Sequence, residues 1–124
     1  MEQTGYIPTS MSVDLKKYRV RIHKDALHRL GDPAFIQLLV SPRDTAVAIR
    51  AVETEYAGDA VHRVRKKLLE SDNSVEIYSR SFIEKLCKII EGSLDHGQCY
   101  RIAGAVIPGE KTAIYSLKTI QKID

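Results

Sequence analysis

Arginine and histidine side chains alternate with apolar residues near the beginning of the chain, in the segment Tyr18–His23. Arg19, Arg21 and His23 take every second position, so a β-strand would place them on one face and the apolar residues on the other. A guanidinium on a rigid strand can contact a phosphate oxygen or donate two hydrogen bonds to a guanine edge. The spacing therefore predicts a half-buried strand whose outer face binds nucleic acid.

Other basic residues extend this candidate site. Lys17 precedes the strand, Arg50 ends a later strand, and the segment 60–70 carries the densest basic cluster of the chain. The complete set of candidate nucleic-acid-binding residues is Lys17, Arg19, Arg21, His23, Arg50, Arg63, Arg65, Lys66 and Lys67. Sixteen acidic residues leave a formal net charge of only +3, so an ordinary solvated surface is the alternative interpretation.

The sequence lacks the residue patterns that are typical of enzymes. Its four histidines are scattered, and it contains no His-Glu-x-x-His motif, paired-cysteine zinc pattern or phosphate-binding glycine loop. Cys87 and Cys99 are expected to be reduced thiols, and a disulfide between them is the alternative that their spacing leaves open. We therefore expect a protein that is not an enzyme, needs no cofactor or metal, and has no small-molecule substrate.

Length and composition favour a small globular protein. The chain has 124 residues, of which 44% are hydrophobic and 28% are charged. Its apolar runs are far shorter than the roughly 18 residues that a membrane-spanning helix requires, and its first residues lack the pattern of a secretory signal. We expect a cytoplasmic protein with no membrane partner, in which residues 1–13 are a flexible arm and residues 14–124 form one domain.

Two similar units organise this expected domain, at about residues 16–52 and 74–117, and each contains a strand, a helix and two further strands. The fold class that we predict is α+β, a tandem βαββ repeat forming one small β-barrel-like or single-sheet domain with helices packed against it. A basic linker, residues 53–73, joins the units, and its residues 60–70 have a pattern compatible with a helix.

Local signals mark the ends of the expected helices. In the first unit, a short helix at residues 26–30 is expected to end at Gly31, where a left-handed residue is favoured. In the second unit, Ser81 and Glu84 have the spacing of a capping box. Residues 117–123 carry a weaker pattern for a final short helix.

The first unit resembles a known DNA-binding module. Val20-x-Ile22-His23-Lys24 is followed by Leu27-x-x-Leu30-Gly31 and then by two apolar strands. This order is similar to the swapped-hairpin module of the AbrB/SpoVT and MraZ families of bacterial regulators, in which a strand ends in Ile-Pro-Lys and a short helix ends in Leu-Gly. His23 stands where that family has proline. The resemblance implies DNA binding and a small barrel closed by two such modules.

Together these patterns predict a nucleic-acid-binding protein, with DNA as the expected ligand and a role similar to that of small bacterial or phage transcriptional regulators. A homodimer is the expected assembly, because exposed strand edges favour pairing. The alternative is a non-enzymatic protein–protein adaptor, or a structural domain, that acts through oligomerisation. In the first interpretation the basic first unit recognises the partner and the second unit completes the core.

Overall fold

Nine β-strands are the main secondary structure of the computed structural model, which describes residues 6–64, 74–90 and 94–123. In chain order these elements are β1 Ile7–Asp14, β2 Arg19–His23, α1 Lys24–Arg29, β3 Phe35–Ser41, β4 Ala46–Val52, β5 Val61–Arg63, β6 Ser74–Tyr78, α3 Arg80–Ile89, β7 Cys99–Ile107, η1 Pro108–Glu110, β8 Thr112–Ser116, η2 Leu117–Thr119 and β9 Gln121–Lys122.

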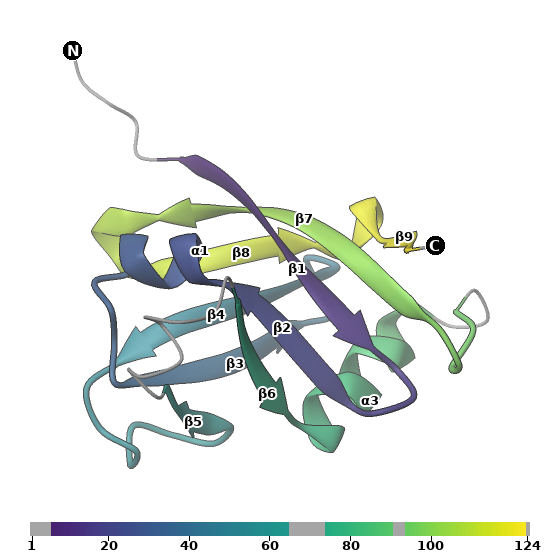
Figure 1. The fold of residues 1–124 in the computed structure, drawn as a ribbon, viewed down its shortest axis with the longest axis horizontal. Helices are drawn as coiled ribbons and strands as arrows, with labels where there is room; N and C mark the ends of the chain where they lie inside the picture. Colours follow the sequence, from purple (N-terminus) through teal and green to yellow (C-terminus); the bar gives the residue numbers. More distant parts are fainter. Residues whose placement is uncertain (1–5, 65–73, 91–93, 124) are drawn as a thin grey trace.

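The strands form one antiparallel sheet that is nearly closed into a barrel (Figure 1). Its order is β5-β3-β4-β8-β7-β1-β2-β6, and β9 pairs with β7 beside this path. The barrel-like shape agrees with the sequence-based expectation, but the tandem βαββ α+β class is wrong. Strand is the predominant secondary structure of the described residues, which include two α-helices, and the pairs β2–β6 and β4–β8 join the two expected units into one sheet.

Strand β1 is the largest difference from the expected organisation, because residues 7–13 were assigned to a flexible arm. It pairs with β7 along its whole length and with β2 over its second half, as Figure 1 shows. Met11 and Val13 point inward and are almost fully buried, whereas Ser12 and Asp14 point outward. Two hydrogen-bonded neighbours and a buried face fix this segment as a central strand.

Helix α3 contributes the buried side chains Phe82, Ile83 and Leu86 to the core and packs against β3. Its cap is Ser79, two residues before the expected cap, because the Oγ of Ser79 accepts a hydrogen bond from the backbone N–H of Phe82 at 3.2 Å. The capping-box assignment to Ser81 is therefore wrong.

The turns and the linker give mixed outcomes. Gly31 has the expected left-handed backbone, with φ of 90°. In the linker, Val61–Arg63 form the edge strand β5 where a helix was expected, since its backbone pairs with β3. At the end of the chain, the expected helix is limited to the short 3₁₀ turn η2, followed by β9.

Gly104 on β7 allows a close crossing with β8. A Cβ atom at this position would lie 2.3 Å from the carbonyl oxygen of Ile114 and 2.8 Å from the Cα of Tyr115. The Tyr115 ring also lies against this glycine and is fully buried. The absence of a side chain at residue 104 therefore allows the largest buried side chain to pack inside the sheet.

Candidate nucleic-acid interface

The outward side chains of four neighbouring strands, β7, β1, β2 and β6, form one polar surface. We call it the arginine face and define it by Cys99, Arg101, Ser10, Ser12, Asp14, Arg19, Arg21, His23, Glu76 and Tyr78. All are exposed or half-buried, whereas the residues between them on β2 and β6 point into the core. The alternation seen in the sequence of β2 thus has the predicted consequence for its side chains.

Strand register arranges this face in rows that run across the strands. In one row Ser12 of β1 is the direct neighbour of Arg21 on β2 and of Arg101 on β7. The next strand extends this row, because Glu76 on β6 lies opposite Arg21. The row therefore contains two arginines with a small serine between them and a carboxylate at one end.

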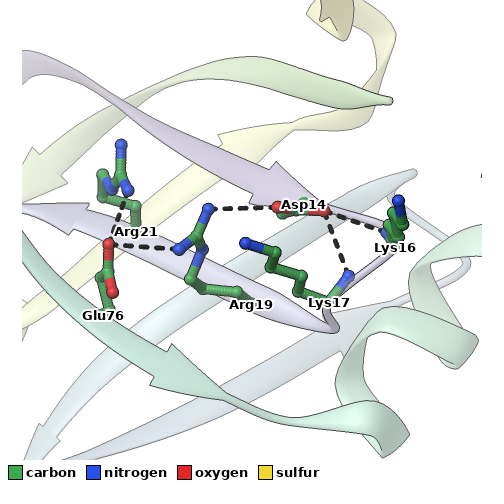
Figure 2. Close-up of polar contacts among 6 residues, drawn as sticks. All are labelled: Asp14, Lys16, Lys17, Arg19, Arg21 and Glu76. Carbon is green, nitrogen blue, oxygen red and sulfur yellow. Dashed lines mark hydrogen bonds and ion pairs between the residues drawn. The ribbon is translucent and has the colours of Figure 1, made fainter. Parts of the chain in front are cut away.

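The second row is centred on Arg19. Asp14 of β1 lies opposite Arg19, with Cys99 of β7 on its other side and Tyr78 of β6 beyond the arginine. Arg19 Nη2 donates to Asp14 Oδ2 at 3.1 Å, and its Nη1 lies 3.6 Å from Glu76 Oε2, as Figure 2 shows. Two carboxylates thus hold this guanidinium, and its side chain is only 20% exposed.

Electrostatics keep both members of the Arg19–Asp14 pair charged. Burial would raise the pKa of Asp14, but the backbone N–H groups of Lys17 and Lys16, at 3.1 and 3.0 Å, and the charge of Arg19 lower it below its usual value. Burial would lower the pKa of Arg19. The hydrogen bond with the Tyr78 side chain and the charges of Glu76 and Asp14 outweigh burial and raise this pKa. This pair is a structural feature of the β1–β2 hairpin.

Arg21 and Arg101 are the more available cations of the face. Arg21 Nη2 donates to Glu76 Oε2 at 2.5 Å (Figure 2), yet the arginine side chain is 46% exposed. Arg101 is exposed, and no carboxylate among the described residues forms an ion pair with it. An exposed ion pair is weak, so an incoming anion can compete with Glu76 for Arg21.

The other predicted site residues fall into three groups. Lys17 is exposed in the turn before β2, next to the arginine face, and His23 is exposed at the end of β2, within the face. Arg50 and Arg63 lie on β4 and β5, outside its rows, where Arg50 Nη2 donates to Gln37 Oε1 at 2.5 Å and the Arg63 guanidinium lies 5.3 Å from the Phe35 ring centroid. The remaining three predicted residues, Arg65, Lys66 and Lys67, lie outside the described residues.

Sequence reasoning missed Arg101, Ser12 and Tyr78. Arg101 lies in an alternating run in which Tyr100 and Ile102 are buried. That period-two pattern was visible and could have placed Arg101 on an outer face. Its position beside Ser12 depends on pairing between β1 and β7, which local sequence does not reveal.

Charge and shape distinguish the arginine face from a neutral surface. Together with the turn lysines Lys16 and Lys17, it carries five cations against two carboxylates, Asp14 and Glu76. A cavity of about 140 Å³ opens between β1 and its neighbours, lined by Ser12, Val13, Asp14, Arg19, Arg21, Cys99 and Ile123. These groups suit an anion such as a phosphate better than a neutral ligand.

Comparison with known proteins assigns no family to this chain: no protein-family model, curated protein or solved structure matches it. Within the described ranges, no helix is long and apolar enough to cross a membrane. The same part of the chain contains no group of three or more His, Cys, Asp or Glu residues placed to hold a metal ion.

Proposed function

We propose that this protein binds nucleic acid through the arginine face, with DNA as the ligand that the sequence favours. The observation that carries this proposal is the row in which the exposed Arg21 and Arg101 flank Ser12. Neighbouring strands lie about 4.8 Å apart, so two strand spacings separate the arginines by roughly 10 Å. Both guanidinium groups can then reach phosphates of one backbone.

The two rows have different roles in this proposal. Asp14 and Glu76 hold Arg19 in place, so it positions the hairpin and adds to the local positive field. Arg21 and Arg101 make the direct phosphate contacts, and Ser12 can donate a hydroxyl hydrogen bond between them. Most of the binding free energy would then come from release of counterions, and affinity would fall as salt rises.

A titration with a fluorescently labelled oligonucleotide tests this proposal. Anisotropy is measured at low and at moderate salt for the wild type and for Arg21→Ala and Arg101→Ala. Each substitution should weaken binding and reduce the slope of log K against log salt by about one. The matched control is Arg29→Ala on α1. Its side chain is 44% exposed and donates to Asp25 at 3.0 Å, and its loss should leave affinity nearly unchanged.

The proposal fails if no binding is detected at low salt, or if Arg29→Ala weakens binding as much as Arg21→Ala does. The second result would mean that only total charge matters. A role in transcription, and the resemblance to the AbrB/SpoVT and MraZ module, remain predictions that this titration does not address.

A second candidate function is self-association in an adaptor role, and one observation favours it. The register places five apolar side chains in a row across the outer surface of β3, β4, β8, β7 and β1: Leu39, Ala48, Ile114, Ala105 and Pro8. The row is roughly 19 Å long at 4.8 Å per strand. Such a row covers far less than the ~800 Å² per partner of a stable interface, so it favours weak pairing of two copies.

A further inference from the structure

We infer that the arginine face takes nucleic acid as a single strand, with the phosphate backbone along β1 and an unstacked base on the ring of Tyr78. This inference rests on the proposed function and adds the class of ligand. It depends on three features of the face, which are the small side chains on β1, the arginines on both sides of them, and one exposed aromatic ring beside Arg19.

Because serine side chains are small, the outward residues Ser10 and Ser12 make β1 the lowest part of the arginine face. Arg21 on β2 borders this part on one side and Arg101 on β7 borders it on the other. The 140 Å³ cavity lies at the end of the same part, between Ser12 and Cys99. Asp14, the next outward residue of β1, also lines this cavity, and its carboxylate is paired with Arg19. A shallow channel that follows one strand between two arginines matches a single backbone, which proteins commonly hold in positively charged grooves.

Tyr78 provides the stacking surface. It is 60% exposed, although burying an aromatic ring is strongly favourable, and it ends β6 directly opposite Arg19. Its hydroxyl is close enough to Arg19 to affect that guanidinium, so the ring lies beside a fixed cation. An exposed ring next to phosphate-binding arginines is the combination that single-strand binding surfaces use.

A duplex does not satisfy this arrangement. Its bases stack on each other, so a protein ring on a sheet surface can meet only their edges or the backbone. Tyr78 lies two strands from β1, roughly 10 Å away across β2, and a base that has left its stack can span from a backbone on β1 toward it. The geometry therefore selects a strand whose bases are free to turn outward.

Equilibrium binding of two forms of one labelled 15-nucleotide DNA tests the inference. The strand is measured alone and after annealing to its complement, and an RNA of the same sequence is included. The wild type should bind the single strand about tenfold more tightly than the duplex. Tyr78→Ala should weaken single-strand binding about 5- to 100-fold, as expected for the loss of one stacked base, and Tyr78→Phe should retain binding within about twofold.

Tyr56→Ala is the matched control, because Tyr56 is 86% exposed and lies outside the arginine face. It should bind like the wild type. Equal affinity for both forms, or an unchanged Tyr78→Ala variant in a protein that Arg21→Ala still weakens, overturns the single-strand inference and leaves the proposed function standing. If neither form binds at low salt, the proposed function fails as well.

Discussion

Replacing Glu76 with glutamine would remove one negative charge from the β6 side of the arginine face while keeping the size of the side chain. Glu76 Oε2 lies 2.5 Å from Arg21 Nη2 and 3.6 Å from Arg19 Nη1. It therefore competes with a phosphate for the guanidinium of Arg21 in the proposed complex. We expect Glu76→Gln to strengthen nucleic-acid binding, because a competing anion and a source of repulsion are both lost.

The expected gain in affinity is modest, because the Arg21–Glu76 ion pair is exposed to water. The Glu76 carboxylate and a phosphate bound to Arg21 are two negative charges, and at roughly 5 Å in water they repel each other by about 0.8 kcal/mol. Removing this repulsion corresponds to about fourfold tighter binding. Surface ion pairs contribute about 0–1 kcal/mol to folding, so the free energy of unfolding should fall by less than about 1 kcal/mol. Arg19 keeps its bond to Asp14 and should hold its position.

Anisotropy at low salt measures the change in affinity, and urea unfolding measures the change in stability. Glu84→Gln is the control of equal charge, since Glu84 lies on α3, is not one of the residues that define the arginine face, and pairs with Arg80. It should change affinity much less. Weaker binding by Glu76→Gln would refute the reasoning, because it would show that Glu76 holds the arginines in the geometry that binds.

Further expectations concern the core, the acid response and self-association. The pKa of Asp14 is lowered in the folded state, so its stabilisation is present above about pH 4. This stabilisation is lost as pH falls further. The difference in free energy of unfolding between the wild type and Asp14→Asn, measured in urea, should therefore disappear at low pH. Met11→Ala should lower the free energy of unfolding by about 2–5 kcal/mol in urea. Gly104→Ala should lower the free energy of unfolding by about 3 kcal/mol, measured as a lower melting temperature, because the backbone of Ile114 and Tyr115 must move to make room for the added Cβ. Ile114→Glu should reduce concentration-dependent light scattering, and unchanged scattering would contradict the self-association candidate.

Local pattern was sufficient for the elements that carry their own signal. Alternation predicted β2, and apolar runs separated by turn residues predicted the β3–β4 and β7–β8 hairpins. Gly31 correctly marked the end of α1. The outward direction of Arg19 and Arg21 followed from the same periodicity, because a strand with one buried face has no freedom to present its side chains otherwise.

Local sequence pattern could not predict the pairing between strands that are far apart in the sequence. In β1, the outward Pro8 and the inward Thr9 obscure an alternation that Met11 and Val13 continue. The carboxylate partners of the arginines could not be foreseen either. Asp14 and Glu76 lie 5 and 57 positions from Arg19, and only the pairing of β2 with both neighbours brings them together.

The pairing of β1 with β7 also determines when the protein can fold. Asp14 pairs with Cys99, 85 positions later in the chain, so closing this contact joins about two thirds of the sequence into one loop. At about 5–20 residues per second, a growing chain waits roughly 4–17 s between making these two residues. Such long-range pairing makes folding slow. Arg101 lies on the same late strand, so a nascent chain completes its arginine face only after β7 has been made.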